Sequence, residues 1–166
     1  MKKQLLLLSF LIATNVIFAQ SPIDKGQLQF NAGLGLSSWG VPIYIGADYG
    51  IHEDITIGGE LSFRSYREDY FAARYRHSVI GISGNGNYHF NRLLNIPSEW
   101  DFYAGLNLGF YILNSSNGYP GSTSSGLGLG AQVGGRYYFN DQFGINLEIG
   151  GSNAFSGSKF GVTLRL

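Results

Sequence analysis

The sequence contains no cysteine, only four prolines and few charged residues. The absence of cysteine excludes disulfide bonds, thiolate metal sites and lipid attachment through cysteine. Charged residues form 13% of the chain, which is low for a protein whose outer surface meets water. No apolar run after residue 20 approaches the roughly 20 residues that a membrane-spanning helix needs. These shortages exclude a disulfide-stabilised fold and a helical membrane protein.

The first twenty residues have the layout of a secretion signal. Lys2 and Lys3 precede an apolar run at 5–18, and Ala19-Gln20 follows as a cleavage site. We therefore expect a signal peptide over 1–19 and one domain over 20–166; a retained membrane anchor is the alternative. Loss of Lys2 and Lys3 leaves nine of the 11 basic residues against 11 acidic ones, a net charge of −2. This charge argues against nucleic acid as a partner.

Apolar and non-apolar residues alternate along most of the chain. In DFYAGLNLGFYI, at 101–112, every second residue from Phe102 is apolar, and mainly glycine, asparagine and tyrosine stand between. A period of two indicates a β-strand with one apolar face. The same pattern predicts eight strands, at 27–36, 41–51, 55–66, 77–90, 101–112, 126–139, 143–151 and 159–166. About ten residues is the length of a tilted strand that crosses a membrane.

The predicted connections alternate in length. Tight turns are expected at 52–54 and 140–142, and longer joints at 65–76, 114–125 and 152–158; 37–40 is short, and 91–100 is a long exception on the tight-turn side. Short turns at one rim and long loops at the other are typical of outer-membrane barrels. The tight turns predict that Phe139 lies opposite Phe143 and Ile51 opposite Ile55, so that apolar residues pair with apolar residues.

The composition of the second face decides which side is the interior. In a water-soluble barrel, apolar residues fill the interior and the outer face is rich in Lys, Glu and Thr. Here the non-apolar face is mostly Gly, Asn, Ser and Tyr, which suits a narrow lumen, while the band of Leu, Ile, Val and Phe suits lipid. The sequence therefore predicts an all-β fold, an eight-stranded antiparallel up-and-down transmembrane β-barrel. Aromatic residues near the strand ends, with Trp39 among those nearer the loop rim and Phe139 among those nearer the turn rim, suggest interfacial girdles, although aromatics are also good strand formers.

A few charged residues fall on the predicted lumen face. They are Asp48, Glu60 and Glu148 with Arg64, Arg136, Lys159 and Arg165. The 140–142 turn places Glu148 opposite Gly134 and diagonal to Arg136, and Lys159 or Arg165 can approach it from the other side. Because eight strands enclose just enough room for side chains, we expect this network to plug the lumen. A narrow channel for ions or small solutes is the alternative.

Residues for catalysis or metal binding are sparse. The three histidines do not complete a triad from the sequence, although His77 can meet Ser or Glu from 65–76 near the outer rim. No metal-ligand spacing is present, and GLGLG at 126–130 lacks the downstream glycine of a nucleotide fingerprint. We expect no catalytic residue, cofactor or metal; a lipid-modifying enzyme is the less favoured interpretation.

The joint SYREDYFAARYRHS, at 65–78, combines aromatic and charged residues. Tyr and Arg dominate recognition hot spots, so this joint is a candidate contact surface. The residues that would form it are Tyr66, Arg67, Tyr70, Phe71, Arg74 and Tyr75. The simpler interpretation is an extension of the third and fourth strands above the membrane, with arginines that meet lipopolysaccharide phosphates.

Three segments carry a family resemblance: RYYFNDQFGINLEIG at 136–150, YHFNRLL at 88–94, and the ending KFGVTLRL. They resemble the small eight-stranded outer-membrane barrels of Gram-negative bacteria, the OmpA/OmpX-like family. The resemblance implies a barrel in the outer membrane with both termini in the periplasm. It also implies that the last strand is read by the barrel-assembly machinery, although this chain ends in Leu166 rather than in an aromatic residue. We expect a non-enzymatic monomer with a structural or surface-interaction role.

Overall fold

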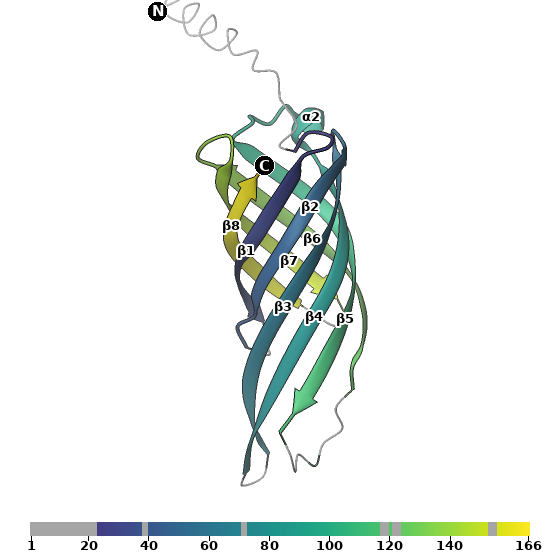
Figure 1. Ribbon diagram of the computed structural model, residues 1–166, viewed down its shortest axis with the longest axis vertical. Helices are drawn as coiled ribbons and strands as arrows, with labels where there is room; N and C mark the ends of the chain where they lie inside the picture. The colour runs from purple at the N-terminus through teal and green to yellow at the C-terminus, as the bar shows by residue number, and fades with distance from the viewer. Residues whose placement is uncertain (1–22, 38–39, 71–72, 117–119, 121–123, 153–155) are drawn as a thin grey trace, which may run out of the picture.

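The computed structural model describes residues 23–37, 40–70, 73–116, 120, 124–152 and 156–166 (Figure 1). Eight strands follow one another along the chain: β1 (Leu28–Ser37), β2 (Ile43–His52), β3 (Ile55–Tyr70), β4 (Ala73–His89), β5 (Trp100–Ser115), β6 (Gly126–Tyr138), β7 (Phe143–Ser152) and β8 (Ser156–Arg165). One short helix, α2 (Asn91–Leu94), lies between β4 and β5. Within these ranges no helix is both long enough and apolar enough to span a bilayer.

The strands form one closed barrel. Each strand pairs antiparallel with its neighbour in sequence, and β1 pairs with β8 to complete the ring. Closure leaves no edge strand in the barrel wall, so backbone N–H and C=O groups are bonded within it. The predicted fold class, an eight-stranded antiparallel up-and-down barrel, is confirmed.

The apolar face points outward. Leu106, Leu127 and Leu129 on β5 and β6 are 65–67% exposed, whereas Gln29 and Thr163 on the other face are completely buried. This is the reverse of a water-soluble barrel, in which the large apolar residues are inside. The predicted face assignment is correct, and the glycine-rich face lines the lumen.

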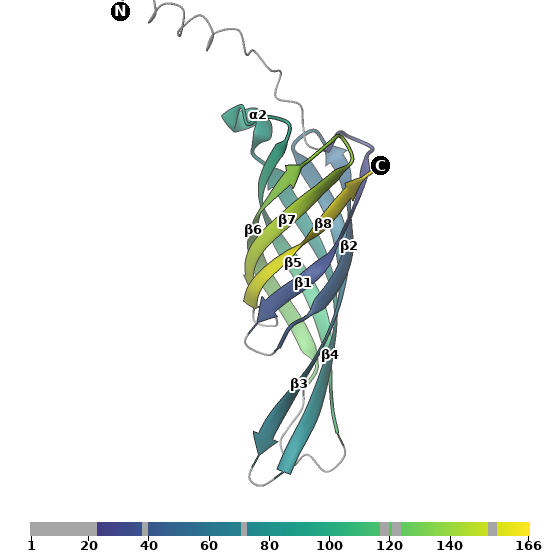
Figure 2. The same cartoon turned by 90° about the vertical axis from the view of Figure 1, so that its left-hand side faces the viewer.

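The two ends of the barrel differ. Tight turns, α2 and the C-terminus lie at one end, called the turn end, at the top of Figure 1. At the opposite loop end, β3, β4 and β5 continue well beyond the other strands (Figure 2). β2 begins at Ile43, opposite Phe63, and β3 then runs on to Tyr70. The predicted joint at 65–76 is therefore mostly strand, and we call residues 64–70, 73–79 and 113–115 the loop-end extension.

The two predicted turn registers have different outcomes. Phe139 N donates to Phe143 O over 2.9 Å, so that hairpin closes as predicted. The Ile51–Ile55 pairing is wrong, because His52 lies opposite Ile55 and the register shifts between Gly50 and His52. Ile51 is the extra residue of a β-bulge, a feature that alternation does not reveal.

The exceptional joint at 91–100 contains α2. This helix ends at Asn95, whose φ of 51° is left-handed, a common helix stop. Leu93 and Leu94 are 64% and 63% exposed, and Figure 2 shows α2 projecting sideways from the turn end. Aromatic rings form a row along this rim, from Phe102 to Trp100, Tyr137, Phe139 and Phe143, with neighbouring centroids 4.8–6.1 Å apart. Trp39, expected in the opposite girdle, lies outside the described residues.

Candidate functional site

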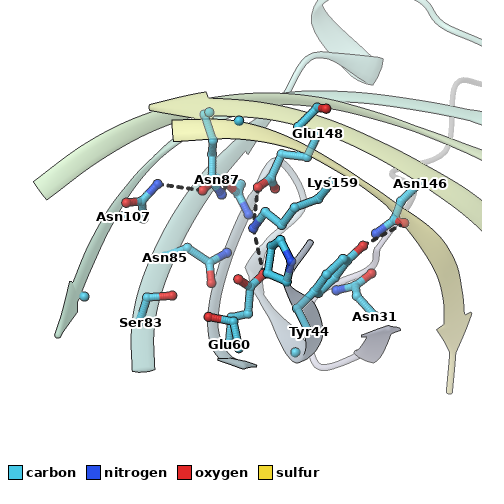
Figure 3. A pocket seen from close by; sticks show the side chains of 18 of the residues that line it. Asn31, Tyr44, Glu60, Ser83, Asn85, Asn87, Asn107, Asn146, Glu148 and Lys159 are labelled. Atoms are coloured by element: carbon cyan, nitrogen blue, oxygen red, sulfur yellow. Dashed lines mark hydrogen bonds and ion pairs between the residues drawn. The ribbon is translucent and has the colours of Figure 1, made fainter. Parts of the chain in front are cut away.

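The lumen holds a polar cavity of about 110 Å³, enough for several water molecules. Several amide side chains line it: Asn31, Asn85, Asn87, Asn107 and Asn146 are shown in Figure 3. The cavity reaches from Ser37 and Arg64 near the loop end to Arg136 deeper in the barrel. The interior of the barrel is therefore polar and has room for water, in contrast to an apolar core.

One lysine spans the middle of this cavity. Lys159 Nζ on β8 lies 2.7 Å from Glu60 Oε2 on β3 and 2.7 Å from Glu148 Oε1 on β7 (Figure 3). β3 and β7 are four strands apart in the ring, so this bridge crosses the barrel. The Tyr103 hydroxyl donates to Glu148 Oε2 over 2.9 Å. The predicted approach of Lys159 to Glu148 is thus observed, with Glu60 as a second partner.

A second charged cluster lies nearer the turn end. Arg136 on β6 donates to Asp48 Oδ2 on β2 over 2.7 Å and to Asp101 Oδ2 on β5 over 2.9 Å. Asp101 also lies 2.7 Å from His89 Nδ1, and His89 Nε2 is 3.0 Å from Thr56 Oγ1. All five side chains are buried. Because β2 and β6 are opposite strands, the Arg136–Asp48 bond also spans the lumen.

This cluster differs from the predicted one. Arg136 bonds to Asp48 and Asp101 rather than to Glu148, which is engaged by Lys159. The sequence reasoning missed Asp101, because the apolar alternation begins at Phe102. The sequence does contain a pattern that points to Asp101. Asp101 is two residues before Tyr103 and therefore faces the same side of β5, and it lies opposite Arg136 in the β5–β6 pairing.

Further buried side chains lie between this cluster and the turn end. The Tyr138 hydroxyl and the Gln29 amide are hydrogen-bonded, and the Arg165 guanidinium lies 3.8 Å from the centre of the Tyr138 ring. Thr163 is completely buried in the same region, and Ile23 is 1% exposed. Arg64 lies at the other end, where it donates to Ser37 Oγ over 3.2 Å. The seven predicted lumen charges therefore occupy several levels rather than one network.

Glycines make room for these long side chains. A Cβ at Gly134 would lie 2.2 Å from the Tyr103 ring, and a Cβ at Gly58 would lie 2.2 Å from Asp48 Oδ1. Both distances are far below van der Waals contact, so a larger residue at either position would displace the Tyr103 ring or the Asp48 carboxylate from the place where it forms its bonds. The glycine-rich face is required by the polar interior.

The loop-end extension carries the predicted contact residues on two faces. Tyr66 and Tyr75 share the inward side, and the Tyr66 ring stacks on His77 with centroids 5.0 Å apart. Arg67 and Arg74 are exposed on the outward side with Arg76. Phe71 and the side chain of Tyr70 lie outside the described residues.

The outward side has an unbalanced charge. Arg74 Nε donates to Asp69 Oδ1 over 2.8 Å, which raises the pKa of the Arg74 guanidinium. Arg67 lies directly opposite Arg76, and no described acidic side chain forms an ion pair with either. Opposed residues have Cβ atoms about 4.5–5.5 Å apart, and like charges there repel. The two guanidinium groups therefore add positive charge to the outward side of the loop-end extension.

The structure also brings together a histidine, a serine and an acid. His77 Nδ1 lies 2.7 Å from Ser115 Oγ, and His77 Nε2 lies 3.4 Å from Glu68 Oε2. The His77 side chain is only 2% exposed, beneath Tyr66, and neither His77 nor Ser115 lines the lumen cavity. Among the residues placed by the structure, no three His, Asp or Glu side chains form a metal-binding group.

Comparisons with known proteins give one family and a set of similar folds. The family model described as outer membrane protein beta-barrel domain matches residues 10–164. OprG from Pseudomonas aeruginosa has a TM-score of 0.69 at 9% identity, over 87% of this chain and 97% of OprG. The N-terminal barrel domain of OprF from the same organism scores 0.55 at 15% identity, over 86% and 98% of the two chains. Neisserial surface protein A scores 0.56 at 19% identity, over 84% and 95%.

At such low identities these likenesses concern the fold alone. The comparison with curated protein sequences gave no match.

Proposed function

Since the chain belongs to the outer-membrane β-barrel family, we propose that its lumen is closed by its own side chains and that its role is structural or one of surface contact. The observation that carries this proposal is two sets of salt bridges, each of which spans the barrel. Lys159 joins Glu60 to Glu148, and Arg136 joins Asp48 to Asp101. A solute would have to break both, and an unpaired buried charge costs several kcal/mol.

The conductance of the refolded barrel in a planar bilayer tests closure. We expect a small or absent steady conductance for the wild type. Glu148→Ala removes one of the two partners of Lys159 and the acceptor of the Tyr103 hydroxyl, but it leaves the Lys159–Glu60 bond, the Arg136 cluster and Tyr138 in place. It should therefore make brief openings more frequent without a steady open state. A large, stable wild-type conductance that is unchanged in Glu148→Ala would reject closure by these side chains.

A narrow channel is the second candidate function, and the polar cavity favours it. Its volume of about 110 Å³ can hold several waters, and a layer of buried side chains that includes Arg136, Gln29 and Tyr138 lies between it and the turn end. If that layer opens, ions have a polar path through the barrel. The same conductance measurement separates the two functions.

We infer that the protein is not an enzyme, and the geometry at His77 supports this. A nucleophilic serine needs a neighbouring base together with space for the substrate carbonyl. Ser115 has the base, but the histidine ring is covered by Tyr66 and almost fully buried. The same contacts serve a structural purpose, because they join β3, β4 and β5 in the loop-end extension.

We propose that the turn end faces the periplasm, which puts both termini there and the loop-end extension outside. Because the chain has no cysteine, single cysteines report orientation without background. A cysteine at Ser116 should react with an impermeant thiol reagent on intact cells, and one at Asn140 should not. Reaction at Asn140 alone would reverse the orientation.

Lipopolysaccharide is the proposed partner of Arg67 and Arg76. Phe63 is the last outward apolar residue of β3, and Arg67 follows four residues later. At about 3.3 Å per residue and a strand tilt near 40°, the backbone of Arg67 lies roughly 10 Å beyond Phe63 along the membrane normal. Headgroups extend roughly 5–8 Å beyond the hydrocarbon, and arginine side chains reach back that far. Guanidinium groups at this distance from the hydrocarbon can form charge-assisted hydrogen bonds to lipopolysaccharide phosphates.

The double variant Arg67→Gln/Arg76→Gln should bind lipopolysaccharide more weakly, by about 1 kcal/mol for each arginine removed. Binding to refolded protein in phosphatidylcholine nanodiscs, titrated with lipopolysaccharide, measures this loss. Arg74→Gln is the control, because Arg74 already pairs with Asp69. Equal losses in both variants would show that position on the sheet does not matter.

Two further expectations concern assembly. We propose that β8, whose outward residues include Phe160, Val162 and Leu164, is the strand read by the barrel-assembly machinery. We also propose a monomer, since the ring of strands is closed by β1 and β8 within one chain.

A further inference from the structure

The lipid-facing wall has a hollow at the turn end. An apolar groove of about 840 Å³ lies over β5, β6 and β7, and its surface is almost entirely nonpolar. Ala104 and Gly135 are the smallest outward residues in its lining, and Phe102, Val133, Tyr137 and Leu147 surround them. Elsewhere along these strands the outward positions are mainly Leu, Ile and Phe.

The strand register explains the hollow. Gly135 lies between Phe102 on β5 and Leu147 on β7, and Ala104 lies opposite Val133. Two small residues on adjacent strands are therefore diagonal neighbours on the outward face. The Phe102 ring leans over Gly135, 3.1 Å from where a Cβ would be. On the lumen side, the Tyr103 ring occupies the equivalent space at Gly134, so the floor of the groove is little more than backbone.

The groove opens toward an unusual rim. Phe90 and Trp100 line its turn end, and Phe90 is the residue from which α2 starts. Leu93 and Leu94 of α2 are among the most exposed apolar side chains described. Figure 2 shows α2 to the side of the barrel rather than over its mouth. Leucines in that position favour a lipid interface over water, and Trp and Tyr favour the headgroup level.

We propose that this groove seats one acyl chain of a phospholipid from the turn-end leaflet. The chain lies over Ala104, beside the Phe102 ring that covers Gly135, with its headgroup at the level of Trp100 and Tyr137, and α2 packs its two leucines into the same leaflet. The occupant is a lipid because the groove is part of the face that the bilayer covers. This site rests on the membrane location of the barrel and is independent of whether the lumen conducts.

Trp100 provides the test, because Trp39→Phe leaves it as the only tryptophan. The protein is reconstituted in phosphatidylcholine vesicles with a rising fraction of phospholipid brominated on its acyl chains, and Trp100 fluorescence is recorded. A seated chain predicts quenching that exceeds the bulk bromolipid fraction and saturates. Ala104→Phe, which fills the groove, should remove the excess, and Ala104→Leu should reduce it.

Ala131→Phe is the matched control. Ala131 is exposed on the outward face of β6, toward the loop end, so the same added ring there should leave the excess quenching intact. Heat-dependent gel mobility verifies that each variant is folded. Quenching that follows the bulk fraction in the wild type, or that is insensitive to Ala104→Phe, would overturn the proposal. A conducting barrel with intact excess quenching would reject only the closed lumen.

Discussion

Replacing Arg136 by alanine is expected to lower the free energy of unfolding by about 3–5 kcal/mol, because it leaves buried carboxylates without their cation. Asp48 and Asp101 are 5% and 0% exposed at their side chains, and Arg136 bonds to both. Asn31 and Asn85 also donate to Asp48, but amides do not neutralise its charge. Urea unfolding of the barrel in lipid vesicles, followed by tryptophan fluorescence, measures the loss.

Two controls show whether the loss arises from charge. The triple variant Arg136→Ala/Asp48→Asn/Asp101→Asn removes the uncompensated carboxylates and should recover much of the stability. Arg74→Ala removes an exposed arginine from its pair with Asp69, which should cost little, because exposed ion pairs contribute little to stability. A loss for Arg136→Ala as small as that for Arg74→Ala would mean that the cluster does not stabilise the barrel.

The second large effect is expected on the lipid face. Leu106→Arg places a charge at an outward position in the middle of the membrane-facing part of β5, where Leu106 is 65% exposed. An arginine near the bilayer midplane costs roughly 2–4 kcal/mol. The variant should insert into vesicles poorly, as measured by the fraction of heat-modifiable protein on a gel.

Asp141→Arg tests whether added charge alone is responsible. Asp141 is exposed in the tight turn between β6 and β7, so an arginine there meets water or headgroups and should leave insertion unchanged. If the two variants inserted equally well, the assignment of the apolar face to lipid would be wrong.

Alternation predicted the fold because face and period are local properties of a strand. The eight segments, their lumen faces and the Phe139–Phe143 hairpin all follow from which alternate residues of each strand share a face. This alternation does not show which strands lie opposite one another across the lumen. Arg136 has Glu148 as a diagonal neighbour, yet it bonds to Asp48, which is 88 residues away, because closure of the ring brings β2 opposite β6.

Other departures have equally specific causes. The bulge at Ile51 depends on how the 52–54 turn closes. The loop-end extension was predicted as a joint because Arg67, Glu68 and Asp69 break the apolar alternation where the strand leaves the membrane. Above the bilayer, a strand no longer needs an apolar face, so hydrophobic periodicity ends before the hydrogen-bond ladder does.

The polar interior has a consequence for how the barrel folds. Its cross-lumen bonds join residues far apart in sequence: Lys159 and Glu60 are 99 residues apart, Tyr44 and Asn146 102, and Tyr138 and Gln29 109. Such high contact order makes folding slow, because the chain loses loop-closure entropy before these distant contacts form and stabilise the barrel. A partly inserted sheet would turn unpaired charges toward hydrocarbon. Intermediates with some strands across the bilayer and others outside are therefore high in free energy, and the ring must close as its strands enter the membrane.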